Sequence, residues 1–284
     1  MASPRFERLI RFVSTTGEVH FGEVPKEHPC DRTLIGEEVP LYKGTAPWDD
    51  TLELSGLTAK IQEILSPVID VPCIYGIGLN YRKHAEESGS PIPEAPKGFT
   101  KYPDALAGPY EDIPVHPTAK DLDYEGELVF VMGKNVKNVR TDSEALEAVL
   151  GYTVGNDLSS RYWQEPVRAS SSNYAKSFDK FAPLGPVLVS AKIIPDPAKL
   201  TLRTWVNGEK RQDSGIDDLI YDIPAIIKFL STGHVLRKGA VVMTGTPSGV
   251  GSFLPDGPKF LQDGDEVEIE ITKIGKIQNK IVFE

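Results

Sequence analysis

The stretch that decides the fold reads DYEGELVFV and covers residues 123–131. Its apolar second half predicts a fully buried β-strand. Because side chains alternate along a strand, Asp123, Glu125 and Glu127 are expected to point to the same face. Carboxylates beside a buried strand repel one another and lose hydration unless a cation compensates their charge. The stretch therefore predicts a site for a hard divalent metal, with a solvated strand face as the alternative.

A third carboxylate follows the next predicted strand. Residues 152–154 read as a short strand that ends in Gly-Asn-Asp at residues 155–157. Alone, an aspartate in this position is typical of a turn. Together with Glu125 and Glu127, Asp157 would complete a set of three oxygen ligands, which suits octahedral Mg²⁺ or Mn²⁺.

The composition argues against several classes of function. The chain has 284 residues, of which 40% are hydrophobic and 25% charged, and its formal net charge is −10. This acidity argues against binding to nucleic acid or to an anionic membrane surface, and no apolar run reaches the roughly 18 residues of a membrane span. Cys30 and Cys73 form no disulfide framework, which favours a reducing compartment. We expect a cytoplasmic protein, although arginines near the N-terminus leave a mitochondrial location open.

The order of the predicted elements indicates an α+β chain that is mainly β. Residues 5–24 are typical of a hairpin, and a short helix is predicted over Thr58 to Leu65. Near residue 70 the sequence changes to strands punctuated by glycine. We therefore expect a small N-terminal domain at residues 1–70 and a larger domain at residues 71–284.

Two helices are predicted in the larger part. Thr141 and Glu144 form a capping box before a helix over residues 145–150, which Gly151 is expected to stop. A second helix is predicted over residues 223–231, with proline near its first position. The remaining signals are strand-like and cover residues 201–206, the turn Asn207-Gly208 and residues 266–271.

Polar residues beyond Asp157 suggest an anion clamp. If the segment is a helical turn, Asp157 and Arg161 lie four residues apart and Arg161 and Gln164 three apart, all on one face. The planar fork of the Arg161 guanidinium suits a carboxylate, whereas a surface ion pair is the plainer alternative. Lys176, which lies between aromatic residues, would stabilise a developing enolate if it faces substrate.

A candidate base lies earlier in the chain. His84 and Glu87 are three residues apart, so on a helical turn the carboxylate can orient the imidazole for water activation. The same pattern is also typical of surface pairs. Lys101, His116 and the glycine-rich loop at residues 244–251 complete the candidates. The loop offers backbone N–H groups and a hydroxyl to a carboxylate or an oxyanion, or is only a turn.

Taken together, these segments resemble the fumarylacetoacetate hydrolase (FAH) family. The likeness rests on GLNYxxHxxE at residues 78–87, DYEGEL at 123–128, GYTxxNDxSxRxxQ at 151–164, AKSFD and PLGP within 175–186, VNGE at 206–209 and TGTPxGVG at 244–251. The motifs follow one another from about residue 73 to the C-terminus. The first 70 residues resemble the small N-terminal domain of the family's shorter members.

The resemblance implies an FAH-type mixed β-sandwich roll with a small N-terminal α/β domain, and a homodimer. It implies that Glu125, Glu127 and Asp157 hold Mg²⁺ or Mn²⁺. It also implies that His84 and Glu87 form a catalytic dyad on a mobile segment that closes over substrate.

Further residues are implied to contact the substrate, a small 2-keto acid. They are Arg161, Gln164, Lys176 and Lys101, with Thr246 at the carboxylate end of the substrate. We predict a Mg²⁺-dependent hydrolase or lyase that cleaves the C–C bond beside the keto group through a metal-bound enolate, by acylpyruvate hydrolysis or oxaloacetate decarboxylation. An oxaloacetate keto–enol tautomerase or isomerase is the alternative on the same site. A non-catalytic protein that binds a metal and a keto acid is the alternative of another class.

Overall fold

Strand β10 (Gly126–Met132), the apolar half of the opening stretch, is buried along its whole length. The computed structural model describes residues 5–168 and 171–284. Leu128 of β10 belongs to one hydrophobic cluster and its neighbour Val129 to another, so the strand lies between two layers of core. A strand that is covered on both faces has a continuous apolar sequence, as predicted here.

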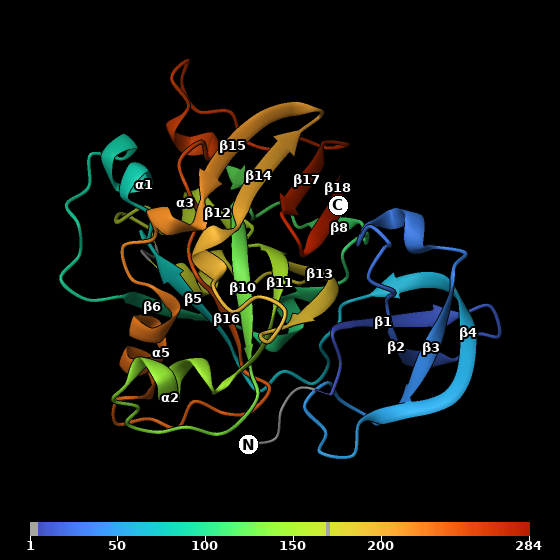
Figure 1. Ribbon diagram of the computed structural model, residues 1–284. Coiled ribbons are helices and arrows are strands. Elements are labelled where there is room, and N and C mark those ends of the chain that lie inside the picture. Colours follow the sequence, from blue (N-terminus) through green and yellow to red (C-terminus); the bar gives the residue numbers. More distant parts are fainter. Residues whose placement is uncertain (1–4, 169–170) are drawn as a thin grey trace.

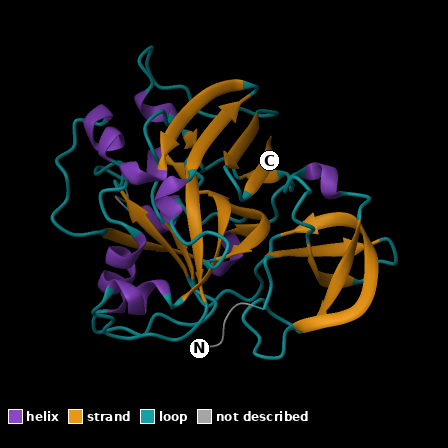
Figure 2. Cartoon of the chain, viewed as in Figure 1, coloured by secondary structure: helices purple, strands orange, loops and turns teal. Residues whose placement is uncertain are grey.

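Two large sheets make up most of the molecule (Figures 1 and 2). The first has the order β2 (Val19–Glu23), β3 (Glu38–Lys43), β4 (Glu53–Leu65), β1 (Arg8–Ser14), β13 (Ala182–Ser190), β11 (Val149–Asn156), β10, β16 (Val241–Met243), β5 (Ile74–Gly78) and β6 (Lys97–Lys101), with β7 (Leu106–Ala107) paired to β13. The second has the order β15 (Glu209–Gly215), β14 (Thr201–Val206), β17 (Glu266–Ile271), β18 (Gly275–Phe283) and β8 (Ile113–Val115). A small pair joins β9 (Leu122–Asp123) to β12 (Ser159–Ser160).

The second sheet packs on the middle of the first, where β14 contacts β10 and where β17 and β18 contact β11. Pairings are mostly antiparallel, but β5 with β16, β7 with β13 and β8 with β18 are parallel. The predicted fold class is therefore confirmed: the chain is α+β, mainly β, with mixed sheets.

The short helices lie mainly at the side of the molecule away from β1–β4, as the purple ribbons of Figure 2 show. The α-helices are α1 (Arg82–Glu87), α2 (Asp142–Leu146), α3 (Arg161–Gln164), α4 (Ser172–Ala175) and α5 (Ile223–Ser231). The 3₁₀ turns are η1 (Arg32–Leu34), η2 (Pro103–Ala105), η3 (Pro197–Lys199), η4 (Ile216–Asp218) and η5 (Gly251–Phe253). None of the helices in the described part of the chain is long and apolar enough to cross a membrane.

The N-terminal hairpin is confirmed as β1 and β2, but the predicted helix over Thr58 to Leu65 is wrong. This segment belongs to the long strand β4, which pairs with β1 and β3. A register shift between Val13 and Ser14 of β1 lies opposite it. Ile61 and Ile64 are both buried although they are three residues apart. An irregularity of this kind breaks the alternation of a strand and produces a spacing that mimics a helix.

The predicted capping box is confirmed at the start of α2, where Thr141 and Glu144 bond each other's backbone. The helix ends at Leu146, earlier than expected, because β11 begins at Val149. Gly151 lies inside that strand, where a Cβ would approach the carbonyl oxygen of Val189 to 2.5 Å. Glycine is therefore needed at position 151 for close packing of β11 against β13, and it does not end helix α2.

The other predicted elements of the larger part are confirmed. Helix α5 has the predicted bounds, and Asp222 caps it by accepting the N–H of Ala225 at 2.8 Å. The turn between β14 and β15 has positive φ at both Asn207 and Gly208, as a two-residue hairpin requires. Strand β17 covers the predicted residues.

The N-terminal strands β1–β4 lie at one side of the molecule, in blue in Figure 1. They remain attached to the larger part, since β1 pairs with β13 through Arg8 and Leu9. Leu9 also belongs to the same buried cluster as Val129 and Leu188. The division near residue 70 stays a prediction.

Candidate active site

Three buried carboxylates meet where β10 begins and its antiparallel neighbour β11 ends. Glu127 is the second residue of β10 and pairs with Gly155 of β11, and Asp157 directly follows β11. Glu125 precedes β10, and its backbone N–H donates to the Asn156 side chain at 3.0 Å. Ligand oxygens of the three acidic residues all lie within 4.8 Å of one another. The antiparallel pairing of β10 and β11 thus brings the predicted ligand set together.

Asp123 does not join this group of carboxylates. The uninterrupted strand expected over the opening stretch is wrong, because β9 ends at Asp123 and β10 begins only at Gly126. The alternation of side chains does not carry across the break. The Asp123 carboxylate instead contacts Arg161 and the backbone N–H groups of Gly251 and Ser252.

Two buried lysines compensate part of the negative charge. Lys176 Nζ lies 2.7 Å from Glu125 Oε2 and 2.6 Å from Asp157 Oδ2, and Lys101 Nζ donates to Asp157 Oδ1 at 2.5 Å. Burial lowers the pKa of Lys101, and Asp157 offsets this only in part. Burial also opposes the charge of Lys176, but Asp157 and Glu125 outweigh it and raise that pKa. Burial opposes ionisation of Glu125 as well, yet Lys176 and Arg161 lower its pKa to about 2.

Glu127 has no such cationic partner. Within residues 5–168 and 171–284, no basic side chain pairs with its carboxylate, which accepts the Gly245 N–H at 2.6 Å. Burial, followed by the charges of Asp157 and Glu125, raises the pKa of Glu127 well above its usual value. A divalent cation would supply the missing positive charge. Carboxylate oxygens are also the ligands that Mg²⁺ and Mn²⁺ prefer, so these residues fit such an ion.

Arg161 and Gln164 lie beside the carboxylates on the short helix α3. The Arg161 Nη2 atom lies 2.6 Å from Glu125 Oε1 and 2.8 Å from Asp123 Oδ2, and its Nη1 donates to Gln164 Oε1 at 3.0 Å. The helical spacing predicted for Arg161 and Gln164 is therefore present. The predicted pairing of Asp157 with Arg161 on that helix is wrong, because the helix begins at Arg161 and the Asp157 oxygens bind the lysines.

His84 and Glu87 are in contact on α1, as the spacing predicts. His84 Nδ1 lies 2.7 Å from Glu87 Oε1, and the same carboxylate accepts the Gly249 N–H, with 3.0 Å to Oε2. The Phe253 ring stands edge-on to the imidazole at a centroid distance of 6.0 Å. His84 is among the groups that lower the pKa of Glu125, so the pair lies in the electrostatic field of the carboxylate cluster.

The glycine-rich loop donates its N–H groups to acidic side chains of the protein itself. The Gly245 N–H donates to the Glu127 carboxylate, and the Gly249 N–H donates to the Glu87 carboxylate. The Thr246 hydroxyl donates to the carbonyl of Gly126 at 2.9 Å and accepts from Gln212 Nε2 at 2.8 Å. The loop therefore organises the site, whereas the sequence suggested an external carboxylate or oxyanion.

One residue predicted from the sequence, His116, takes no part in these contacts. Two residues that do take part, Ser159 and Gln212, were not predicted. His116 is exposed and bonds to Thr118. Ser159 Oγ lies 2.7 Å from Lys176 Nζ, and Gln212 holds both Thr246 and the N–H of Gly126. Ser159 belongs to the motif at residues 151–164 and could have been predicted from it. Gln212 on β15 lies in none of the family motifs.

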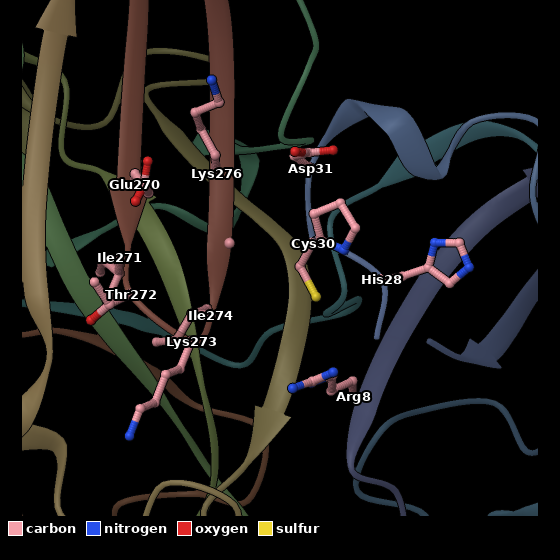
Figure 3. Close-up of a pocket in the computed structure, with 12 residues that line it drawn as sticks. Arg8, His28, Cys30, Asp31, Glu270, Ile271, Thr272, Lys273, Ile274 and Lys276 are labelled. Atoms are coloured by element: carbon pink, nitrogen blue, oxygen red, sulfur yellow. The ribbon is translucent and has the colours of Figure 1, made fainter. Parts of the chain in front are cut away.

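A cavity of about 350 Å³ opens elsewhere, between the N-terminal part and the turn from β17 to β18 (Figure 3). Arg8, Cys30 and Lys276 are among its lining residues, and none of the predicted site residues is. The basic side chains are already bound within the chain, Arg8 to the carbonyl of Lys26 and Lys276 to Glu268. The carboxylate cluster is therefore the stronger candidate for chemistry.

Comparison with known proteins identifies the family of the chain. Residues 73–282 match the family described as fumarylacetoacetate (FAA) hydrolase, C-terminal. The chain belongs to the fumarylacetoacetate hydrolase family. It is 44% identical over 209 residues to the oxaloacetate tautomerase YisK of Bacillus subtilis, covering 72% of this chain and 68% of that protein. It is 38% identical over 219 residues to a mitochondrial oxaloacetate tautomerase of Xenopus laevis, covering 77% of this chain and 68% of the relative.

The FAH family likeness extends to solved structures over the whole chain. The crystal structure of a 5-carboxymethyl-2-hydroxymuconate delta-isomerase from Mycobacterium smegmatis matches 98% of this chain and all of its own, with a TM-score of 0.82 and 31% identity. The relatives with named activities are enzymes. Membership of the FAH family therefore places the chain in a family of enzymes and confirms its fold.

Proposed function

We propose that the protein is a divalent-metal-dependent enzyme that acts on small 2-keto acids. Glu125, Glu127 and Asp157 would hold Mg²⁺ or Mn²⁺. The observation that carries this proposal is the buried, uncompensated carboxylate of Glu127 beside two others. When bound, the metal would act as a Lewis acid that polarises the keto group of the substrate.

The reaction that we propose first is the keto–enol tautomerisation of oxaloacetate. The two relatives described above carry that activity in their names, and the His84–Glu87 pair would supply the base that the reaction needs. His84, oriented by Glu87 at 2.7 Å, would take the proton from C3 of the substrate, and a proton would be returned to the keto oxygen. The Lys176 ammonium already donates to Glu125, Asp157 and Ser159. It would therefore stabilise the negative charge that develops on the keto oxygen through its own charge and not through a hydrogen bond.

Other side chains would bind and orient the substrate. Gln164 Oε1 accepts from Arg161, so its NH₂ group faces away from the guanidinium and can donate to a substrate oxygen. Thr246 and Lys101 would act mainly by fixing the site, because their polar atoms are bound to Gln212 and Asp157 respectively. The contribution of these residues is orientation of the reacting atoms.

C–C bond cleavage is the second candidate reaction, by acylpyruvate hydrolysis or by oxaloacetate decarboxylation. The His84–Glu87 pair favours hydrolysis, since a histidine oriented by a carboxylate can equally activate water. In that case water would add to the distal carbonyl and the bond from that carbon to C3 would break, giving a carboxylic acid and the enolate of pyruvate. Decarboxylation would need no water and would release CO₂ directly.

One assay separates these reactions. Purified protein with Mg²⁺ is given oxaloacetate or acetylpyruvate, and the ratio of enol to keto forms, pyruvate and CO₂ are followed separately. We expect rapid equilibration of the oxaloacetate tautomers, with slow or no pyruvate formation. Faster release of pyruvate from acetylpyruvate than tautomerisation of oxaloacetate would contradict the first proposal and support the second.

The control for the base is a neighbouring glutamate. Glu86 lies on α1 next to Glu87 but is exposed, whereas Glu87 touches His84. Glu86→Gln should keep the activity of the native protein, so any loss specific to Glu87→Gln reports the contact with His84.

A further inference from the structure

The carboxylate of Asp123 is fully buried between two parts of the site. On one side it faces Arg161, with 2.9 Å to Nε and 2.8 Å to Nη2. On the other side it accepts the Gly251 N–H at 2.7 Å, the Ser252 N–H at 3.0 Å and the Ser252 hydroxyl at 3.0 Å. The N–H of Tyr124 donates to it as well, at 3.0 Å. A single side chain therefore joins α3 to the segment that begins η5.

The partners of Asp123 on each side contact residues of the candidate active site. Arg161 contacts Glu125 of the carboxylate cluster and holds the Gln164 amide. The segment around Gly251 leads to the dyad, because Gly249 donates to Glu87 and the Phe253 ring contacts His84. Asp123 itself touches none of the three clustered carboxylates and neither member of the dyad.

The fit around Asp123 depends on a carboxylate. Its two oxygens meet only donors, and an amide in its place would direct an N–H₂ group at Arg161 or at Ser252. Hydrogen bonds between charged partners are also roughly twice as strong as neutral ones. Gly251 belongs to the same arrangement, since a Cβ there would lie 2.6 Å from Asp123 Oδ1.

We propose that Asp123 is a positioning residue that couples Arg161 and its partner Gln164 to the loop that holds the His84–Glu87 pair. Through Arg161 it fixes the Gln164 amide, and through Gly251 and Ser252 it fixes the loop that holds Glu87. The proposal rests on the proposed function for the roles of those groups, but the coupling itself is a property of the folded chain.

The test compares Asp123→Asn with Ser252→Ala and with Asp112→Asn, a control at an exposed aspartate. Hydrogen exchange of the full-length protein is followed by mass spectrometry, and the affinity for oxalate in the presence of Mg²⁺ is measured by calorimetry. In Asp123→Asn we expect exchange to rise about tenfold in residues 82–88 and 249–254, because the loop loses charged hydrogen bonds to a buried carboxylate. Oxalate affinity should fall as well, because Arg161 loses a partner and no longer fixes the Gln164 amide. Ser252→Ala should give a smaller rise in the same segments, and Asp112→Asn none.

Two results would overturn the proposal. One is native exchange in both segments of Asp123→Asn; the other is a rise spread evenly over the chain, which indicates only a general loss of stability. If Asp123→Asn does not fold, Ser252→Ala decides, and an unchanged pattern in that variant overturns the coupling. The exchange measurement needs no substrate, so absence of oxalate binding in the native protein would contradict the proposed function and leave this test intact.

Discussion

Glu127 is the residue at which burial and neighbouring charge act in the same direction. Both oppose its ionisation, and its pKa is raised accordingly. The neighbouring Glu125 shows the opposite outcome because Lys176 and Arg161 lie against it. The contrast shows where positive charge is missing from the cluster, and a divalent metal would provide it.

Glu127→Gln tests this charge balance through stability. Without metal, the variant should be more stable than the native protein by about 1–3 kcal/mol near neutral pH, because the buried Glu127 carboxyl must either take up a proton or stay charged without an ionic partner, whereas an amide is neutral. The stabilisation by Mg²⁺, about 2.7 kcal/mol at one hundred times the dissociation constant, should be lost. Urea unfolding with and without Mg²⁺ measures both effects, and the exposed Glu147→Gln is the control. A native response to Mg²⁺ in Glu127→Gln would remove that residue from the metal site.

Glu87→Gln tests the dyad. The imidazole should lose its orientation, and kcat for oxaloacetate tautomerisation should fall about 100-fold, at the lower end of what a positioned base contributes. The KM should change little if Glu87 does not touch substrate. Steady-state kinetics beside Glu86→Gln provide the comparison, and equal rates in the two variants would exclude a role for Glu87.

At the level of single residues, much of the candidate site could be predicted from the sequence. The spacing of the residues predicts the contact between His84 and Glu87. Spacing and the family motifs together predict the grouping of Glu125, Glu127 and Asp157. The position of Asp123 did not follow, because a two-residue break in the strand cannot be read from alternation. The contact between Gln212 and Thr246 is equally hidden, since it joins residues that are distant in the chain.

Among the elements, the loop from β16 to η5 has the greatest effect on the site, because it donates successively to Glu127, Glu87 and Asp123. Elements with strong local signals, such as α5 and the hairpin of β14 and β15, were predicted correctly. Strand β4 was not, since the register of its pairing with β1 shifts by one residue between Ile61 and Glu63 and so places the buried Ile61 and Ile64 at a helical spacing. Pairing between strands is a tertiary property that local sequence does not encode.

Gly249→Ala tests the loop. Gly249 has a φ of +98° and its Cβ would lie 2.0 Å from the carbonyl oxygen of Arg211, so the loop must shift and Glu87 loses its backbone donor. We expect a fall in kcat of about 100-fold, as for a misplacement of about 1 Å near the reacting atoms. Gly257→Ala is the matched control, because its φ is +96° and nothing lies within 4 Å of the new Cβ. Equal kinetics in the two variants would contradict the role assigned to the loop.

For the whole molecule, the notable feature is that the N-terminal strands join the sheet that carries the site. Leu9→Ala, in the shared core, should lower the free energy of unfolding by about 2–5 kcal/mol. Leu57→Ala, whose side chain is 66% exposed, should change it by no more than about 0.5 kcal/mol. Urea unfolding monitored by tryptophan fluorescence gives both values. An equally small effect at Leu9 would favour independent domains divided near residue 70.

The homodimer and the cytoplasmic location stay predictions at this scale. Sedimentation velocity measures the first directly, and a single species at twice the chain mass is the expected result.

The measurement that tests the central claim most directly is a calorimetric titration of Mn²⁺ or Mg²⁺ into the metal-free protein and into Glu127→Gln. We predict one ion bound per native chain, and binding that is lost or weakened at least tenfold in the variant. Equal binding by both proteins, or none by the native chain, would contradict the metal site formed by Glu125, Glu127 and Asp157.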